Sequence, residues 1–462
     1  MMKPKNKRIM EVDIAIIGAG LTGLTTGFHL VQRNKKIIVL EQAGRVGGQI
    51  HSFQKDGFVF ESGPNTGVIS YPEVAELFQD LGNRCVLQTA HEEAKKRLIW
   101  KGNRFHALPS GLASAIATPL FSWYDKFRIL GEPFRAKGTN PDESVGELAA
   151  RRLGKSFVNY AVDPFLSGVY AGDPMKLTTR YALPKLYNLE QTYGSFIKGS
   201  IAKAKLQKTN RDKLATKQVF SVQGGLENLV RALADAIDHE QIVLNAQGIK
   251  VVPMADGKWQ INYMSPEGER IVHAKKVVTT TGAYTLPSLL PFVDKEDMQK
   301  ISSLYYAPVI QVSVGVKEVD KDKYRAFGGL VPSCEKRNVL GIFYPSACFD
   351  GRSPVNGALF SFFIGGVRHP EMLEKTDDEI KELVRNNFHQ MLKFADQVQP
   401  DLIEIFRHKT AIPQYRADSG ERLATIDKLQ QKYPGLIIAG NLRDGIGMAD
   451  RIRQGTTIGS SI

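Results

Sequence analysis

The stretch VDIAIIGAGLTG, residues 12–23, decides how the first part of the chain folds. Its apolar first half is typical of a buried parallel strand. A helical pattern then continues to about Gln32, and a second apolar run, Ile37–Leu40, ends in Glu41. Strand, glycine-rich turn, helix and strand in this order predict a βαβ unit whose turn binds a dinucleotide.

Each glycine of this turn has a physical role in such a site. Gly18 permits the tight turn, Gly20 lets the backbone approach a pyrophosphate, and Gly23 lets the helix pack closely on the strand. The helix N-terminus directs unpaired N–H groups and a partial positive charge at the phosphates. Glu41 stands where an acidic side chain accepts hydrogen bonds from ribose hydroxyls. The predicted contacts of this unit are Gly18, Gly20, Leu21, Thr22, Gly23, Glu41 and Gln42.

The segment that follows, Gly44-Arg45-Val46-Gly47-Gly48, indicates which dinucleotide is bound. GAGLTG, then an acidic residue, then GRVGG resembles the signature of the superfamily of FAD-containing amine oxidases and protoporphyrinogen oxidases. The resemblance implies that the arginine and the paired glycines wrap the FAD pyrophosphate and ribityl chain. Glycine allows close backbone approach, and arginine offers a fork of donors to phosphate. The implied contacts are Arg45, Gly47, Gly48 and Gln49, with Gly63, Pro64, Asn65 and Thr66 in a turn similar to one beside the flavin ring of porphyrinogen oxidases.

Two distant segments are expected to return to the FAD. After the strand near Ile242, the resemblance makes Ile249 the candidate contact for the adenine end. Near the C-terminus, a buried run ends in glycine and a helix opens, which the family places under the pyrimidine edge of the flavin. Its dipole there stabilises negative charge on the reduced ring. The implied contacts are Gly440, Ile446, Gly447 and Met448.

The chain departs from the family just after these residues. The family usually continues with a cysteine or a similar residue, whereas this chain reads Asp450-Arg451-Ile452-Arg453. A second departure follows Tyr415, where the family often has a Gly-His pair and this chain has Arg416-Ala417. Contacts made by these two segments therefore cannot be transferred from the family.

The run VDPFLSGVYAGDP, residues 162–174, points to the substrate. It is very similar to a run of the protoporphyrinogen oxidases, and the resemblance covers nearly the whole chain, from Ile14 to about Gly455. The implied reaction is the six-electron, FAD-dependent oxidation of protoporphyrinogen IX to protoporphyrin IX in haem biosynthesis, with oxygen or a quinone as electron acceptor. Alternatives are oxidation of coproporphyrinogen III to coproporphyrin III, a flavin amine oxidase and a carotenoid-type desaturase.

No side chain is predicted to be catalytic, because flavin N5 would take the hydride and tautomerisation can relocate protons. Arg97, on a predicted hairpin, is expected to hold a substrate propionate, since guanidinium stays charged and grips a carboxylate bidentately. The alternative is a surface arginine on a basic hairpin. Apolar side chains are expected to sandwich the macrocycle, with ordinary sheet core as the alternative. The substrate candidates are Arg97, Gly168, Leu330, Leu340 and Phe343.

The length of 462 residues predicts more than one domain. The expected fold is α/β: a Rossmann-type, two-dinucleotide-binding FAD domain, a mixed-sheet substrate domain and a helical membrane-associated domain. The expected limits are 10–85, 215–295 and 405–462 for the FAD domain, 86–214 for the helical domain and 296–404 for the substrate domain. Three scattered cysteines make a disulfide framework or a metal site unexpected.

The net charge of +13 is unevenly spread, and residues 198–217 hold seven Lys/Arg against one Asp. This run predicts either a solvated helix face or contact with an anionic membrane surface. With the apolar run that contains Leu120, Phe121, Trp123 and Tyr124, it favours a peripheral position on the cytoplasmic face of the inner membrane. No membrane span, secretory signal or nucleic-acid partner is expected. A ferrochelatase partner and a homodimer are left open.

Overall fold

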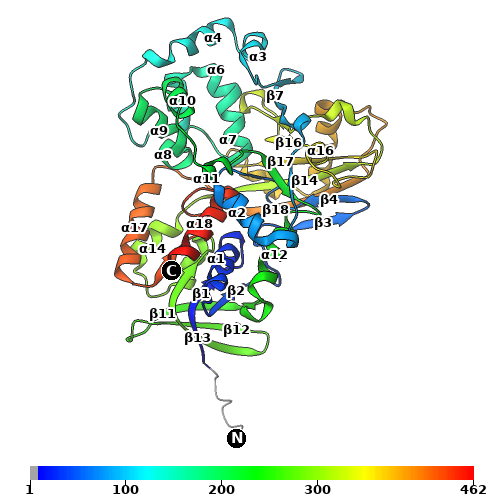
Figure 1. The fold of residues 1–462 in the computed structure, drawn as a ribbon. Helices are drawn as coiled ribbons and strands as arrows, with labels where there is room; N and C mark the ends of the chain where they lie inside the picture. The colour runs from blue at the N-terminus through cyan, green and yellow to red at the C-terminus, as the bar shows by residue number, and fades with distance from the viewer. Residues whose placement is uncertain (1–8) are drawn as a thin grey trace.

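The computed structural model describes residues 9–462, and the first eight residues lie outside the described residues. The prediction of no secretory signal depends partly on those eight residues. Figure 1 shows three sections: a lower α/β section that contains the first strand and the last helix, a sheet section at one side, and a helical section above. The chain has the α/β class that the sequence predicts. Within residues 9–462, no helix combines the length and the apolar character that a membrane crossing requires.

The lower section is built on the predicted βαβ unit. Strand β1 pairs in parallel with β2 on one side and with β13 on the other. β10 and β19 extend this parallel core, and the antiparallel strands β11 and β12 continue from β13. The strands are β1 (Met10–Ile17), β2 (Ile37–Leu40), β10 (Ile242–Val243), β11 (Gln247–Pro253), β12 (Trp259–Ser265), β13 (Gly268–Thr279) and β19 (Leu436–Ile438).

Helices cover both faces of this sheet because its central strands are apolar on both sides. α1, α12 and α18 bury one face, and α13, α14 and α17 pack on the other. α1 and α18, blue and red in Figure 1, lie side by side although they open and close the chain. The helices are α1 (Leu21–Gln32), α2 (Pro72–Leu81), α12 (Glu227–Ile237), α13 (Leu286–Leu289), α14 (Lys295–Ser302), α17 (Ser419–Lys432) and α18 (Met448–Ser461).

The second large sheet has the strand order β18-β14-β17-β16-β15-β7-β8. Strand β14, the second in this order, is buried along its whole length, and α16 covers one face. The spacing of Thr376 and Glu379 in the sequence predicts a capping box at a helix start, and Thr376 caps α16 through this box. The elements are β7 (Arg97–Lys101), β8 (Arg104–Ala107), β14 (Tyr306–Val316), β15 (Gly328–Leu330), β16 (Gly341–Phe343), α15 (Pro345–Cys348), β17 (Ala358–Gly365), α16 (Asp377–Leu392) and β18 (Leu402–Pro413).

The strands of this sheet cross the domain limits expected from the sequence at two places. β7 and β8, expected in the helical section, join the sheet because Arg97 to Ile99 pair with Gly328 to Leu330. β18, most of which was expected in the FAD section, pairs with β14 along nearly its whole length. Sheet pairing between segments so far apart leaves no local pattern in the sequence.

The helical section consists of short helices that lie between β8 and β9 along the chain and above the two sheets in Figure 1. Its polar core is a buried cluster in which Arg152 donates to Glu132 and Glu190. The run 162–174 forms helix α7 and the turn after it. The helices are α3 (Leu112–Ala117), α4 (Trp123–Leu130), α5 (Val145–Arg152), α6 (Lys155–Phe157), α7 (Asp163–Tyr170), α8 (Thr179–Ala182), α9 (Pro184–Tyr193), α10 (Phe196–Ala204) and α11 (Asn210–Lys213).

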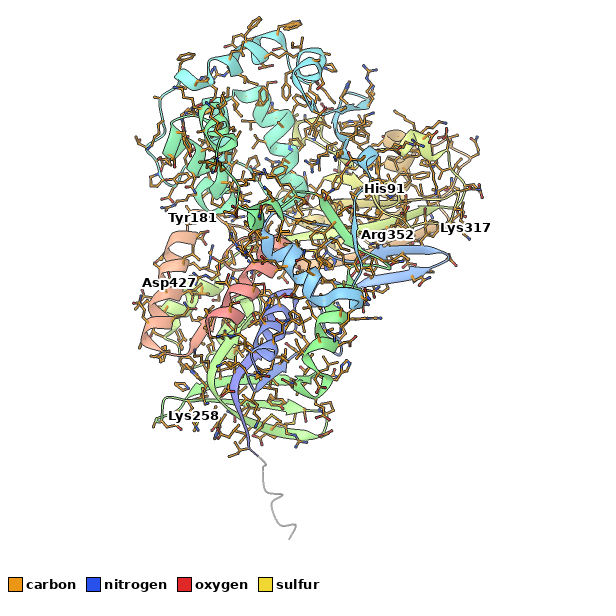
Figure 2. All side chains as sticks on the ribbon, viewed as in Figure 1. His91, Tyr181, Lys258, Lys317, Arg352 and Asp427 are labelled. Carbon is orange, nitrogen blue, oxygen red and sulfur yellow. The ribbon has the colours of Figure 1, made fainter. Side chains whose placement is uncertain are left out.

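Two small sheets and a buried ion pair join the lower section to the second sheet. Arg352, labelled in Figure 2, donates to Glu61 at 3.0 Å and to the Ser221 hydroxyl at 2.6 Å. Burial raises the pKa of Glu61, and Arg352 opposes that rise. Because the partners come from three distant segments, this pair fixes how the sections meet. The small sheets are β3 (Ser52–Lys55) with β4 (Phe58–Glu61), and β5 (Gly67–Val68), β9 (Val219–Val222) and β6 (Leu87–Thr89).

Candidate FAD site

A cavity of about 540 Å³ runs along the carboxyl ends of the parallel strands. Such a crevice is where open α/β sheets bind their ligands. Its walls come from the β1–α1 turn, the loop after β2, the end of β13 and the loop before α18. Of the predicted cofactor contacts, these line the cavity: Gly18, Gly20, Leu21, Thr22, Glu41, Gln42, Gly47, Gly48, Gln49, Pro64, Ile249, Gly440, Ile446 and Met448.

The N-terminus of α1 offers the cavity an anion-binding site. Gly20 caps the helix without any side-chain hydrogen bond, so the first N–H groups of α1 keep no partner inside the helix. A Cβ atom at Gly20 would have no heavy atom within 4 Å, which leaves space beside the backbone. Unpaired N–H groups, the positive end of the helix dipole and open space suit the pyrophosphate of a dinucleotide.

Gly23 does not line the cavity, and the structure shows why the position requires glycine. A Cβ atom there would lie 2.0 Å from the Gly18 carbonyl oxygen. Any larger side chain would push α1 away from β1 and displace the turn between them. Gly23 therefore shapes the site by close packing, the role that the sequence analysis gave it.

Glu41 is held by the backbone on two sides of the cavity. One carboxylate oxygen accepts from the Ala19 N–H at 2.8 Å and the other from the Ala43 N–H at 2.8 Å. Each oxygen keeps a further lone pair for a ribose hydroxyl. The carboxylate thus fixes the loop after β2 against the glycine turn and still faces the cavity.

Arg45 lies outside the cavity wall and bonds to its own loop. Its guanidinium donates to the carbonyl oxygens of Val46, Gly48 and Ile50 at 3.1, 2.8 and 2.9 Å. These bonds hold the Gly47-Gly48 backbone, with left-handed φ at both glycines, against the cavity. The arrangement differs from the expectation of a direct phosphate contact, since the donors of Arg45 are directed at carbonyls.

Four other predicted contacts also lie beyond the cavity wall: Gly63, Asn65, Thr66 and Gly447. The Asn65 amide donates to the Gly63 carbonyl at 3.0 Å, and its oxygen accepts from Ser361 at 3.2 Å. Asn65 therefore ties the predicted flavin-side turn to the second sheet. Gly447 caps α18 and its N–H donates to Asp450 at 3.0 Å.

Several lining residues were missed by the sequence analysis. Thr280, Thr281 and Tyr284 follow β13, and Tyr306 begins β14. Their only signal in the sequence is their position after a buried strand, which many residues share. Arg451 also lines the cavity, although the sequence marks it only as a departure from the family.

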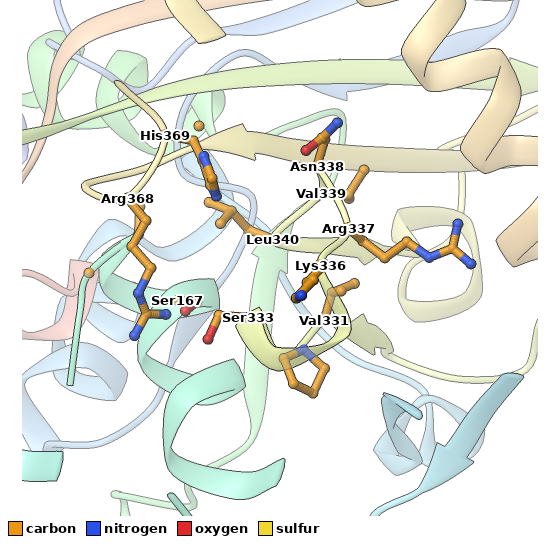
Figure 3. Close-up of a pocket in the computed structure, with 14 residues that line it drawn as sticks. Ser167, Val331, Ser333, Lys336, Arg337, Asn338, Val339, Leu340, Arg368 and His369 are labelled. Carbon is orange, nitrogen blue, oxygen red and sulfur yellow. The ribbon is translucent and has the colours of Figure 1, made fainter. Parts of the chain in front are cut away.

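Three of the predicted substrate residues gather around the contact between α7 and the second sheet, whereas Phe343 and Arg97 do not. Gly168 on α7 packs against Leu330, where a Cβ atom would lie 2.4 Å from a Leu330 methyl carbon. Leu340 lines a second cavity of about 190 Å³, shown in Figure 3. Phe343 is buried with Ala94 and Phe349, as a core residue would be.

Arg97 is the other residue that lies apart. It is exposed at the start of β7, and its guanidinium lies over the Phe327 ring at 5.6 Å from the ring centre. It lines neither the dinucleotide cavity nor the cavity beside Leu340. A role in holding a propionate stays a prediction.

The cavity beside Leu340 has basic side chains around it. Lys336, Arg337 and His369 line it, as does Arg368. Arg368 is neutralised by Asp163 and Asp173, the latter at 3.0 Å. His369 pairs with Glu371, and the Arg337 guanidinium donates to Gln390 at 2.7 Å. Lys336 is left as the cation that suits a carboxylate group in this cavity.

Comparison with known proteins agrees with this geometry. The family described as flavin-containing amine oxidoreductase matches residues 21–456. Protoporphyrinogen oxidase 2 of Arabidopsis thaliana is 28% identical over 96% of this chain and 92% of its own length. Human protoporphyrinogen oxidase is 28% identical over 98% of both chains.

Among solved structures, a candidate protoporphyrinogen oxidase from Exiguobacterium sp. 255-15 has the same fold. It superposes with a TM-score of 0.80 at 20% sequence identity and covers 99% of each chain. The helix N-terminus, the glycine backbone and the carboxylate of Glu41 fit the phosphates and ribose of FAD. The chain belongs to the flavin-containing amine oxidoreductases, a family that implies FAD as the cofactor.

Proposed function

We propose that this flavin-dependent oxidoreductase oxidises protoporphyrinogen IX to protoporphyrin IX. The observation that carries the proposal is its likeness, over nearly the full chain, to protoporphyrinogen oxidases of plant and human origin. The amine oxidases share the family, but the relatives with these names support a porphyrinogen. Oxygen or a quinone would be the final electron acceptor.

The reaction removes six electrons in three two-electron steps, each taking a hydride from a bridging carbon and a proton from a pyrrole nitrogen. The hydride acceptor of each step would be supplied by bound FAD, which oxygen or a quinone would reoxidise between steps. The chain supplies binding and orientation: the α1 N-terminus holds the phosphates and Glu41 the ribose. No side chain is required as a base, because the porphyrinogen can tautomerise between steps.

Leu330, Leu340 and Gly168 support a macrocycle site where α7 meets the second sheet. Leu340 lines the cavity of about 190 Å³, which is smaller than the roughly 300–1,000 Å³ usual for ligand pockets. This space suits one edge of the macrocycle, with Lys336 near a propionate. We infer that α7 and the β15–β16 turn move apart when the substrate enters.

The test is to incubate the FAD-loaded enzyme separately with protoporphyrinogen IX and coproporphyrinogen III and to follow porphyrin fluorescence. We expect a higher kcat/KM with protoporphyrinogen. A higher kcat/KM with coproporphyrinogen would make coproporphyrinogen the proposed substrate, since its four carboxylates also suit a basic pocket. Faster peroxide formation with a primary amine would refute a porphyrinogen function altogether. Anaerobic assays with a quinone would identify the acceptor.

We also propose that the helical section rests on an anionic membrane, at the cytoplasmic face in the localisation that the family resemblance implies. α4 and the turn after it expose Trp123, Phe127 and Phe134 by 62%, 67% and 87%. Exposed aromatic side chains beside lysines are typical of a membrane-surface site. A ferrochelatase that receives the product and a homodimer belong to the same proposal.

Of the anchors chosen from the sequence, Trp123 and Tyr124 are exposed, but the other two are not. Leu120 and Phe121 are buried, and Phe121 stacks on Phe157. They form a small core with Ile99, because the turn before α4 directs them inward. Removing them would disturb this core, so the membrane contact must come from α4 itself.

Flotation with liposomes that contain anionic phospholipid tests this proposal. Binding at low salt should fall on replacing Trp123 and Phe127 with serine, and should weaken as salt shortens the Debye length to about 8 Å. Replacing exposed Val355, which lies outside the helical section, with serine is the matched control. Equal flotation of all three proteins, or no flotation of the wild type, would rule out the α4 surface.

A further inference from the structure

Arg451 is a buried cation that lines the FAD cavity. Its side chain lies on the first turns of α18, and the residue is 8% exposed. Its guanidinium donates to the carbonyl oxygens of Arg443 and Gly445, both at 2.8 Å, and to the Gln454 amide oxygen at 2.8 Å. These three partners carry no charge at the bonded atom.

No carboxylate of residues 9–462 forms an ion pair with Arg451. Asp450 and Asp444 are the carboxylates that act on Arg451. Asp450 bonds to the Gly447 N–H and to Tyr71 instead, and Asp444 is connected through Gln454, which donates to it at 2.7 Å. The Arg451 Nε is buried and has no hydrogen-bond partner among the described residues. A buried charge without an opposite charge costs free energy, so such groups are normally paired.

The order of the FAD parts along the cavity decides which of them Arg451 meets. Glu41 and Ile249 mark the ribose and adenine end, and the α1 N-terminus marks the pyrophosphate. The cavity is also lined by Pro64 after β4, Ile446 before α18 and Met448 at the start of α18. Because FAD is a linear molecule, this remaining end is left for the flavin ring.

Arg451 lies on that flavin side of the α1 N-terminus. Its backbone carbonyl accepts from the Thr22 hydroxyl at 3.4 Å, so the first turns of α1 and α18 touch. The two helices run in parallel, since Thr22 meets residue 451 and Arg33 meets residue 459. Both N-termini therefore face the cavity, as their neighbouring positions in Figure 1 allow.

We infer that Arg451 is a positioning residue for charge: it supplies the positive charge that stabilises the reduced flavin. A hydride adds two electrons and one proton to the oxidised flavin, which thereby gains one negative charge. A fixed cation in a low-dielectric wall favours that form over the neutral oxidised form. Arg451 thus raises the reduction potential of the flavin, whichever substrate delivers the hydride.

The test compares flavin reduction potentials by anaerobic titration against a reference dye. Arg451→Gln removes the charge and keeps a hydrogen-bond donor, and Arg451→Lys keeps the charge. We expect the Gln variant to lose about tenfold in preference for the reduced flavin, which is about 30 mV for a two-electron couple. The Lys variant should stay close to the wild type.

Two further variants make the result specific. Arg422, also buried but on α17 and paired with Asp418, does not line the cavity. Arg422→Gln should leave the potential unchanged. Asp444→Asn removes the carboxylate that compensates Arg451 indirectly, and should raise the potential. This variant keeps the inference testable if Arg451→Gln does not fold.

Three results would overturn the inference. The first is a wild-type potential in Arg451→Gln or in Asp444→Asn. The second is a loss of FAD affinity in Arg451→Gln with an unchanged potential, which would assign the charge to the phosphates. The third is an equal shift in Arg422→Gln. None of these depends on the porphyrinogen, so a failed substrate assay would leave the inference standing.

Discussion

Replacing Glu41 tests two roles of its carboxylate: holding the backbone around the cavity and accepting hydrogen bonds from the ribose. Its oxygens accept from the Ala19 and Ala43 N–H groups at 2.8 Å each, and they face the ribose site. Ala19 is fully buried, whereas Ala43 is exposed. In Glu41→Ala the Ala43 N–H can bond to water, but the Ala19 N–H loses its partner.

The magnitudes follow from these two environments. A buried donor without a partner costs about 1–3 kcal/mol, so apo-protein stability should fall by about that amount. A hydrogen bond from the ribose to a charged acceptor contributes roughly 1.5–3 kcal/mol, so FAD should bind about 10-fold to 150-fold more weakly. Glu41→Gln keeps a carbonyl oxygen for Ala19 and should restore stability more than affinity.

Denaturant unfolding of the apo-protein gives the first quantity, and titration of the apo-protein with FAD, followed by flavin fluorescence, gives the second. Glu240→Ala, on the exposed turn before β10, is a control that should change neither. If Glu41→Ala kept the wild-type Kd for FAD, the assignment of Glu41 to the ribose would be wrong. If its stability were also unchanged, the bond to Ala19 would not contribute.

Four other substitutions test separate parts of the structure. Gly23→Ala should prevent FAD retention, because its Cβ atom would lie 2.0 Å from the Gly18 carbonyl oxygen; a yellow variant with normal flavin content would contradict this. Arg97→Ala should raise KM for protoporphyrinogen about tenfold to a hundredfold at normal FAD content, if a propionate pair worth about 1.5–3 kcal/mol is lost; unchanged kinetics would leave Arg97 as a surface residue. Leu330→Ala should raise KM, whereas a change in thermal stability alone would favour a core role. The bonds to Lys375 and the α16 cap lower the pKa of Glu379 from 4.5 to about 2. The contribution of Glu379 to the free energy of unfolding should therefore be present above pH 4.5 and be lost as the pH falls towards 2. A difference in the free energy of unfolding between wild type and Glu379→Gln that stays constant over this range would refute the reasoning.

The parts of the fold that the sequence predicted are those encoded locally. The βαβ unit is one example, and the cap of α16 at Thr376 is another, because their signals lie within a few residues. The hairpin of β7 and β8 was also predicted, but not the sheet that it joins. Its partner β15 is more than two hundred residues away, and nothing in either strand identifies the other.

The candidate site divides in the same way. Gly20 and Glu41 were predicted because their chemistry depends on spacing within one unit. Arg45 was predicted to bind phosphate, but its guanidinium donates to loop carbonyls, because a guanidinium fork fits carbonyl oxygens as well as phosphate. Among the apolar residues, only the path of the turn before α4 decides that Phe121 is buried and Phe127 exposed.

The charged groups that line the cavity complement the charges that FAD carries in its oxidised and reduced states. At the adenine end the wall offers the carboxylate of Glu41 to neutral hydroxyls. At the pyrophosphate it offers the N-terminus of α1, and at the far end the N-terminus of α18 with Arg451. The phosphates are negative in both states, so α1 contributes to binding alone, whereas the flavin gains its charge only on reduction. A cation placed there acts on the potential more than on affinity, and for this reason affinity and potential, measured on the Glu41 and Arg451 variants, should change independently of each other.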